Sequence, residues 1–199
     1  MSPLLETIKC EDGKLFNLDF HQARFENAQK EYVGITPKTK LFDTIEIPEF
    51  AKSGLFRCRV TFSKQIDKIE FIPHNYREII SLKLVEDNNI DYHYKYANRE
   101  KLQRLFDLRG NCDDIIIVKN GFITDSFVAN LVLFDGKNWL TPDTPLLSGT
   151  QRAKLLKEEK IFESHINIHN LQKFEKVGLI NALNNLEEMP IIEIRHVFE

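Results

Sequence analysis

Three Asp-Gly or Asn-Gly pairs, each set between short apolar segments, constrain the fold of this chain most. They are Asp12-Gly13, Asn120-Gly121 and Asp135-Gly136, flanked by LLETIK and KLFNL, by DIIIV and FITD, and by NLVLF and NWLT. Such pairs readily adopt the positive φ angles that a tight hairpin turn requires. They therefore predict antiparallel hairpins in both halves of the chain and favour these over a doubly wound parallel sheet.

The remaining pattern adds strands and helices. Three further segments alternate apolar and polar residues, as half-buried strands do: residues 55–63, 66–72 and 79–86. One helix is predicted to be capped by Asp19 and to end near Gly34, a second to cover residues 98–109, and a third to follow Gly149. We expect an α+β chain with antiparallel or mixed sheets and peripheral helices.

The length and the charge balance limit what this chain can be. Its 199 residues leave room for two small domains, which we place at residues 1–90 (smaller) and 91–199 (larger). The net charge is −3, so there is no basic excess for a nucleic acid. No stretch approaches the length of a membrane span, and the N-terminus lacks an export signal. Three widely spaced cysteines indicate reduced thiols, and we expect a cytoplasmic protein.

Lys95, in the segment IDYHYKYANRE, is the first candidate for chemistry. On a strand, Asp91, His93 and Lys95 would share one face, and the three tyrosines at 92, 94 and 96 the other. One interpretation is a solvated lysine on an exposed face. The alternative is a lysine whose amine forms a Schiff base, which requires a held lysine in a partly dry cavity.

Asp125, in NGFITDSFVANLVLFDG, is the second candidate. It is either a turn aspartate that orders its own backbone or a buried carboxylate paired with a cationic ligand nitrogen. The loop before Thr150 could be a plain helix start or an anion site at the positive end of the helix dipole. His21 and Arg24 lie three residues apart on one helical face. Arg24 is either a surface side chain, which is the usual case, or a phosphate ligand if a partner elsewhere in the fold assists it.

Other polar residues give weaker signals. Arg57 and Arg59 share a strand face that is either solvated or able to receive a substrate carboxylate. His165 and His169 alternate with isoleucines and have no recognisable third ligand, so we predict no metal site. The chain has no G-x-S-x-G elbow, P-loop or G-x-G-x-x-G motif.

The order of these segments resembles the class IV aminotransferases, the fold-type IV pyridoxal-phosphate enzymes. The similarity covers nearly the whole chain. ETIKCEDGKLFNLDFHQARF is similar to the opening hairpin and its His-x-x-Arg helix, and HYKYANR to the lysine segment in its lyase form. NGFITDSFVANLVLF, LTPDTPLLSGTQRAKLL and LINALNNLEEMPIIEI are similar to the segments of the ring-nitrogen carboxylate, the phosphate loop and the closing Asn-Ala-Leu.

The resemblance implies a role for each matched residue. Lys95 would hold pyridoxal 5'-phosphate as a Schiff base and transfer protons, and Asp125 would face the pyridine nitrogen. The phosphate would meet several residues: Arg24, Thr150, Gln151 and Asn181. Thr7 falls where the lyases have a threonine near the substrate. The family also implies a homodimer and a small amino-acid-like substrate.

The chain departs from the family at several positions. Asp125 stands where the family usually has Glu, which shortens the reach by roughly 1.5 Å. Gln151 replaces a common threonine, the chain starts at the ETI strand, and the stretch between Arg24 and Lys95 is short. Our first expectation is a 4-amino-4-deoxychorismate lyase, which releases p-aminobenzoate and pyruvate for folate synthesis. The alternatives are a branched-chain or D-amino-acid aminotransferase and a non-catalytic, shortened member of the family.

Overall fold

The computed structural model of the chain describes residues 2–199 and contains two compact units. Of the described residues, the smaller unit comprises residues 2–76 with Tyr94–Asn98, and the larger unit comprises Arg77–His93 with Arg99–Glu199. The predicted division at residue 90 lies inside the larger unit. The reason is strand pairing, because β5 (Leu82–Glu86) pairs in parallel with β6 (Asp114–Lys119) and so belongs to the larger sheet.

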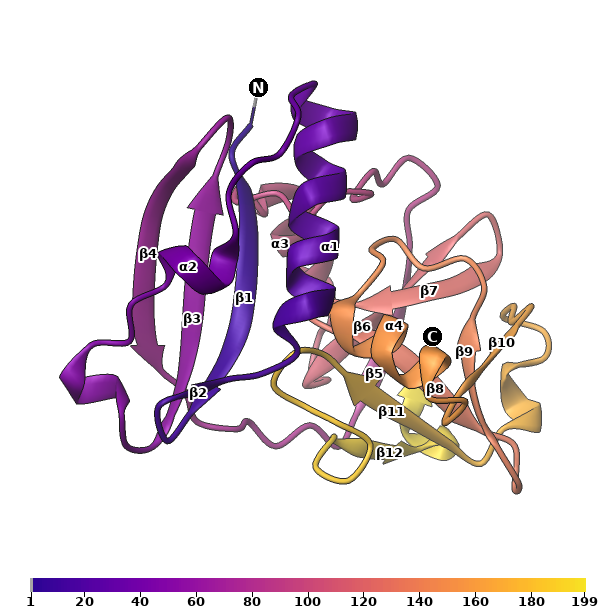
Figure 1. The fold of residues 1–199 in the computed structure, drawn as a ribbon. Helices are drawn as coiled ribbons and strands as arrows, with labels where there is room; N and C mark the ends of the chain where they lie inside the picture. Colours follow the sequence, from indigo (N-terminus) through magenta and orange to yellow (C-terminus); the bar gives the residue numbers. More distant parts are fainter. Residues whose placement is uncertain (1) are drawn as a thin grey trace. The chain divides into compact units, whose positions relative to one another are not determined.

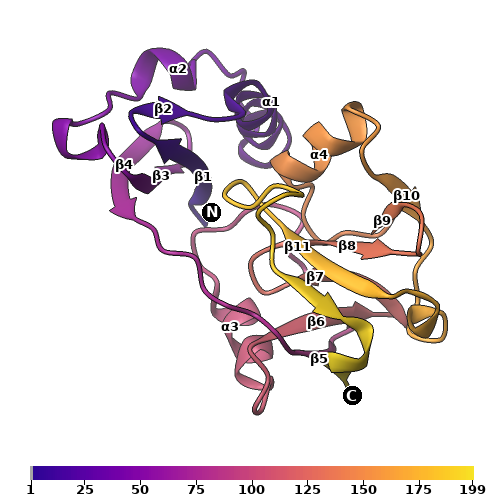
Figure 2. The same ribbon diagram turned by 90° about the horizontal axis from the view of Figure 1, so that it is seen from below.

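The smaller unit is a four-stranded antiparallel sheet with helices on one face (Figures 1 and 2). Its strand order is β2-β1-β3-β4. The strands are β1 (Leu4–Glu11), β2 (Lys14–Leu15), β3 (Leu55–Phe62) and β4 (Ile66–Pro73). The helical segments are α1 (Leu18–Ala28), the π-helix η1 (Gln29–Val33), α2 (Leu41–Thr44) and the 3-10 turn η2 (Glu49–Ala51).

Alternation along the strands gives this sheet two different faces. Ile8, Cys58 and Val60 are fully buried and pack with Phe25 of α1 and Leu41 of α2 in one apolar core. The residues between them point to the opposite face, as the two-residue period of a strand requires.

The larger unit contains a nine-stranded mixed sheet (Figure 2). The strand order is β10-β9-β8-β7-β6-β5-β13, and β11 pairs with β8 and with β12. Besides β5 and β6, the strands are β7 (Phe122–Ser126), β8 (Asn130–Phe134), β9 (Trp139–Pro142), β10 (Phe162–Ser164), β11 (Lys176–Ile180), β12 (Ile191–Glu193) and β13 (Val197–Phe198). Three pairs are parallel: β5 with β6, β13 with β5, and β10 with β9.

Helix α4 (Thr150–Lys157) packs through Leu155 against Val132 and Ile180, whereas Leu131, Leu133 and Leu179 join a separate apolar core. Three further segments belong to the unit: helix α3 (Glu100–Asp107) and the 3-10 turns η3 (Leu171–Lys173) and η4 (Ile194–His196). The sheet thus carries apolar packing on both faces, which accounts for the almost continuous burial of β6, β7 and β8.

The hairpin predictions are confirmed. Asp12 and Gly13 have φ angles of 47° and 72°, and Asn120 and Gly121 have φ angles of 52° and 80°. These are the left-handed conformations that the Asp-Gly and Asn-Gly pairs predict for a tight hairpin turn. The third hairpin, at Gly136, has a longer loop in which Asp135 Oδ1 accepts hydrogen bonds from two following backbone N–H groups.

Several element boundaries differ from prediction. The first helix begins after Asn17, which is itself left-handed, so Asp19 lies in the first turn and is not the cap. The helix expected over 98–109 is shorter, and β5 begins at Leu82 rather than 79. The alternating segment after Phe162 leaves the strand at Ser164, so His165 and His169 do not lie on a continuous strand face.

Lys95 is not on a regular strand, which corrects the prediction for residues 91–96. Its carbonyl accepts from Leu5 N–H at 2.8 Å, and Tyr96 N–H donates to Tyr94 O at 2.9 Å, so Lys95 is the central residue of a three-residue turn. Tyr94 and Tyr96 both contact the Tyr32 ring, with centroids at 5.0 and 5.7 Å. Ring packing and a short contact with the edge of β1 therefore hold the segment in place of a strand ladder.

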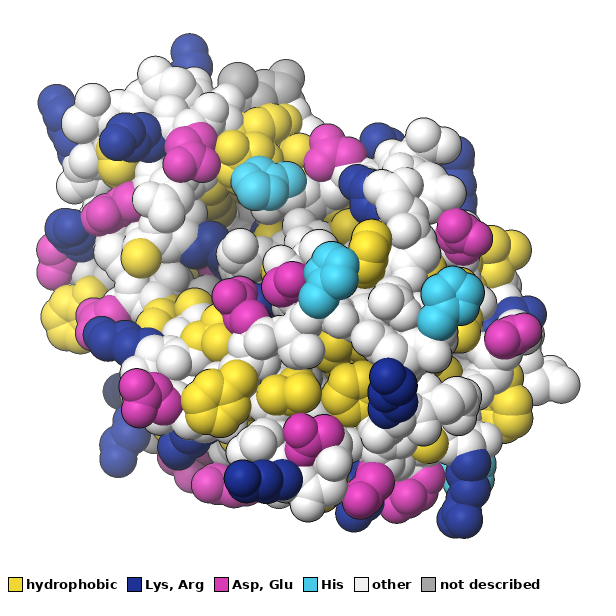
Figure 3. Space-filling model, turned by 90° about the vertical axis from the view of Figure 1, so that its right-hand side faces the viewer, with side chains coloured by type: hydrophobic (Ala, Val, Ile, Leu, Met, Phe, Trp, Pro, Cys, Tyr) yellow, Lys and Arg dark blue, Asp and Glu magenta, His cyan; other side chains and the backbone are white. Residues whose placement is uncertain are grey.

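The surface has a mixed charge. On the face drawn in Figure 3, acidic and basic side chains are interspersed and neither sign forms a continuous field. Within residues 2–199 no helix has the length and apolar character needed to cross a membrane.

Candidate functional site

Asp125 lies at the centre of a buried hydrogen-bond network in the larger unit. The end of β7 places Asp125 opposite Asn130, the first residue of β8. Asn130 Nδ2 donates to Asp125 Oδ1 at 2.8 Å and to Leu147 O at 2.9 Å, and Leu147 N–H donates to Asp125 Oδ2 at 2.9 Å. The carboxylate is thereby fixed to the loop that leads into α4.

Burial dominates the electrostatics of Asp125. The side chain is only 6% exposed, and desolvation raises the pKa of Asp125 to about 6, against the opposing effect of the bonds from Leu147 and Asn130 and the charge of Arg152. Arg152 itself is engaged by Glu163 at 2.6 Å and by Pro142 O at 2.9 Å. A cationic group placed against Asp125 would favour the ionised carboxylate, because an opposite charge nearby lowers the pKa of a carboxyl group.

The start of α4 is set close to this network by Gly149. A Cβ atom at position 149 would lie 1.8 Å from Asn130 Oδ1, so only glycine permits this approach of loop and strand. Thr150 and Gln151, the first residues of the helix, are both buried. Their N–H groups belong to the first turn, which has no intrahelical acceptors and lies at the positive end of the helix dipole.

Asn181 connects two loops of the larger unit. Its Oδ1 accepts from the N–H groups of Leu183 and Asn184, at 2.9 and 3.1 Å, and its Nδ2 donates to Val128 O at 3.4 Å. The side chain therefore contacts the turn after Asp125, a contact that the sequence did not predict.

In the smaller unit, Arg24 belongs to a buried ionic cluster with Glu6 and His21. Arg24 Nε and Nη2 donate to the two Glu6 oxygens at 2.8 and 2.6 Å, a bidentate pair, and His21 Nδ1 lies 2.6 Å from Glu6 Oε2. Burial favours a raised pKa for Glu6, but Arg24 and His21 outweigh it and lower the pKa to about 2. The three-residue spacing of His21 and Arg24 on α1 therefore lets both side chains bond to the same carboxylate, that of Glu6 on β1.

The environment of His21 disfavours the protonated imidazole. Burial lowers its pKa, opposed by Glu6 and assisted by the charges of Arg24 and Lys95. With an ionised carboxylate as its partner, the imidazole carries its proton on Nδ1. The effect of Lys95 on His21 shows that the half-buried lysine lies within electrostatic reach of the cluster.

Thr7 lies on the other face of the small sheet. It pairs with Arg59 of β3, and Lys9 pairs with Arg57, whereas Glu6 pairs with the core residue Val60. The structure therefore puts Thr7 beside Arg59 and does not place it with Arg24. Arg57 Nε is buried and has no hydrogen-bond acceptor among residues 2–199.

The two histidines considered as metal ligands form no metal site in the part of the chain that the structure describes, where no group of three or more potential ligands occurs. His165 Nδ1 lies 3.1 Å from Asp143 Oδ2 at an exposed position. Sequence reasoning gave no role to Glu6 or Asn130. The sequence features that could have indicated a role are the position of Glu6 in the Glu-Thr pair and the position of Asn130 at the end of SFVAN.

These features agree with a match to a known family. The family described as amino-transferase class IV matches residues 3–194. The chain belongs to the class IV aminotransferase family. The mixed α+β architecture is accordingly the fold of the fold-type IV enzymes.

Similar proteins support this class IV assignment. A Haemophilus influenzae Rd relative, named only as an uncharacterized protein, is 39% identical over 188 residues, which is 94% of this chain and 100% of the relative. A Haemophilus somnus structure, provisionally named a 4-amino-4-deoxychorismate lyase, has a TM-score of 0.88 and 34% identity, covering 94% of this chain and 98% of that one. A pyridoxal-phosphate-bound Mycobacterium tuberculosis structure, titled a hypothetical aminotransferase, has a TM-score of 0.78 and 14% identity, covering 100% and 81%.

Replacing Gly149 by Ala should destabilise this class IV protein through Asn130. The added Cβ would displace the Asn130 side chain, and we expect a loss of about 1–3 kcal/mol in the free energy of unfolding. In an Asn130→Ala background the same change should cost much less. Urea unfolding of the wild type, the two single variants and the double variant measures the coupling between positions 149 and 130. An equal loss of unfolding free energy in both backgrounds would contradict a clash between the new Cβ and Asn130.

Stability should fall steeply in acid because of Glu6. Its pKa is about 2 in the folded protein against an ordinary 4.5, so its stabilisation is present above pH 4.5 and is lost as the pH falls from 4.5 to 2. The shift corresponds to about 3 kcal/mol. We expect Glu6→Gln to flatten the pH dependence of the unfolding free energy in that interval, and Glu26→Gln, at a more exposed ion pair, to change it little.

Proposed function

We propose that this protein is a pyridoxal-phosphate-dependent enzyme with Lys95 as its catalytic residue. The observation that carries the proposal is the buried carboxylate of Asp125, which is bonded to the loop preceding α4 in a chain of the class IV family. The family supplies the cofactor, and the residues of this chain supply groups that fit it.

The fit rests on the chemistry of the donor set. Asp125, buried and with a raised pKa, suits the protonated nitrogen of a pyridine ring. The first turn of α4, whose N–H groups lie at the positive end of the helix dipole, suits a phosphate. The resemblance to the family implies that Arg24 would contribute a charge to the phosphate and that Lys95 would hold the cofactor's aldehyde through its amine. When bound, the cofactor acts as an electron sink for the electron pair of a broken bond at the amine-bearing carbon.

Each of these residues would have its own role in the reaction. Asp125 keeps the ring nitrogen protonated, since an ionised carboxylate favours a proton on its neighbour. Lys95 Nζ accepts a proton from the substrate carbon that bears the amine and later returns one. Glu6 holds the Arg24 guanidinium in a fixed direction through two hydrogen bonds. We also propose Asn181 as a phosphate neighbour, with Thr150 and Gln151.

We propose 4-amino-4-deoxychorismate as the substrate, with p-aminobenzoate and pyruvate as products of use in folate synthesis. The lysine segment HYKYANR, Thr7 and LINALN favour the lyase branch. The position of Thr7 beside Arg59, with Arg57 next along β3, suits a substrate that carries carboxylates. We also propose that the protein works in the cytoplasm, as its three widely spaced cysteines indicate, and that it is a homodimer, as its resemblance to the family implies.

The cofactor assignment predicts a visible absorption band when pyridoxal phosphate is added to the purified protein. Borohydride should bleach the band and leave the added mass on the peptide that contains Lys95. Lys95→Ala should lack the band, whereas Lys101→Ala, an exposed lysine on α3, should keep it. A band that persists unchanged in Lys95→Ala would overturn the assignment of this lysine.

Product analysis decides between the lyase and the aminotransferase. With 4-amino-4-deoxychorismate, we expect p-aminobenzoate and pyruvate in equal amounts, and Lys95→Ala should form neither. An aminotransferase would instead convert the cofactor to pyridoxamine phosphate when an amino acid is added without an oxo acid. A wild-type protein that binds no cofactor would point to the non-catalytic alternative.

A further inference from the structure

The turn that follows Asp125 is closed by its own polar groups. It comprises residues 126–129 and connects β7 to β8. Ser126 N–H donates to Ala129 O at 2.8 Å, and Ser126 Oγ accepts from the N–H groups of Val128 and Ala129. The two network residues, Asp125 and Asn130, flank this turn directly, so its conformation sets the direction of both side chains.

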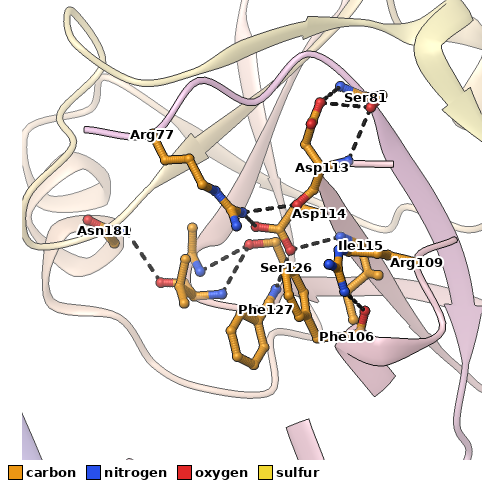
Figure 4. A network of polar contacts seen from close by, with 12 residues as sticks. Arg77, Ser81, Phe106, Arg109, Asp113, Asp114, Ile115, Ser126, Phe127 and Asn181 are labelled. Carbon is orange, nitrogen blue, oxygen red and sulfur yellow. Dashed lines mark hydrogen bonds and ion pairs between the residues drawn. The ribbon is translucent and has the colours of Figure 1, made fainter. Parts of the chain in front are cut away.

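Side chains from distant segments hold the 126–129 turn from outside (Figure 4). Asp114 Oδ1, at the start of β6, accepts from Phe127 N–H at 3.3 Å and from Ile115 N–H at 2.8 Å. Asn181 Nδ2 donates to Val128 O at 3.4 Å. The backbone of this turn is thus bonded by two side chains that are far away from it in the sequence.

Arg99, which is not labelled in Figure 4, provides a third contact. It immediately precedes α3, and its Nη2 donates to Phe127 O. Its guanidinium carbon also lies 4.4 Å from the centroid of the Phe127 ring. The Phe127 ring also stacks on Phe106 of α3, with centroids 4.3 Å apart and planes at 22°, and Arg109 lies 4.2 Å from the centroid of Phe106. Phe127 is therefore held by both a cation and an aromatic ring, a set of contacts that we call the Phe127 clamp.

We propose that Arg99 is a positioning residue, which fixes the 126–129 turn through Phe127 and thereby aims the Asp125 carboxylate at its ligand. The inference rests on the proposed function, in which Asp125 faces the ring nitrogen of pyridoxal phosphate. An arginine suits this position because a planar guanidinium can stack on a ring and donate a hydrogen bond from its edge. A lysine would keep the charge but lose the stacking geometry.

The test compares Arg99→Ala, Arg99→Lys and Phe127→Leu with Arg104→Ala, which changes an exposed arginine on α3. In protein without added cofactor, amide hydrogen exchange at residues 127–129 should be about tenfold faster in the three clamp variants, since the turn opens locally. With pyridoxal phosphate bound, the pH at which the visible band titrates should move in the clamp variants and remain unchanged in Arg104→Ala.

Each outcome decides the role of Arg99. Faster exchange confined to the turn, together with a moved titration, supports the proposal. Unchanged exchange at 127–129, or faster exchange spread over the whole chain with an unmoved titration, overturns it, because Arg99 would then have no role or only a general structural one. If the wild-type protein binds no pyridoxal phosphate, the proposed function fails, and the exchange rates alone decide whether Arg99 holds the turn.

Discussion

The side-chain amide of Asn130 is the interaction on which the larger unit's site depends. A single Nδ2 group bonds both the Asp125 carboxylate and the carbonyl of Leu147, while Leu147 N–H returns a bond to the same carboxylate. Buried polar groups are stable only when they are bonded. These three hydrogen bonds supply partners to the Asp125 carboxylate, to the Asn130 amide and to the backbone of Leu147. They require glycine at position 149, because a Cβ there would keep the loop from approaching Asn130.

The two units hold buried carboxylates in opposite electrostatic states. Glu6 has a cation and a histidine as partners, and its pKa is lowered to about 2. Asp125 has mainly neutral hydrogen-bond donors, and burial raises its pKa to about 6. Glu6 is thus complete within its own unit, whereas Asp125 would be stabilised as an anion by an added cation. This contrast identifies Asp125, and not Glu6, as the carboxylate suited to a cationic ligand atom.

Much of the fold was predictable from local signals. Asn120-Gly121 and Asp12-Gly13 predicted hairpins because few other residues accept their positive φ angles. The Lys95 segment was mispredicted as a strand, because alternation of tyrosines with polar residues looks the same whether a strand ladder or ring packing holds it. Asp19 was mistaken for a cap because the left-handed Asn17 gave no clear sequence signal.

The sequence by itself determined the family, the hairpin framework and the identity of the candidate residues, since the order of short motifs along a chain is a one-dimensional property. Only the tertiary structure decided which of those residues meet. It paired Arg24 with Glu6, set Thr7 beside Arg59 on the opposite sheet face, and bonded Asn181 to the turn after Asp125. These contacts depend on strand register and on loops that meet across long sequence separations, and neither is encoded in local periodicity.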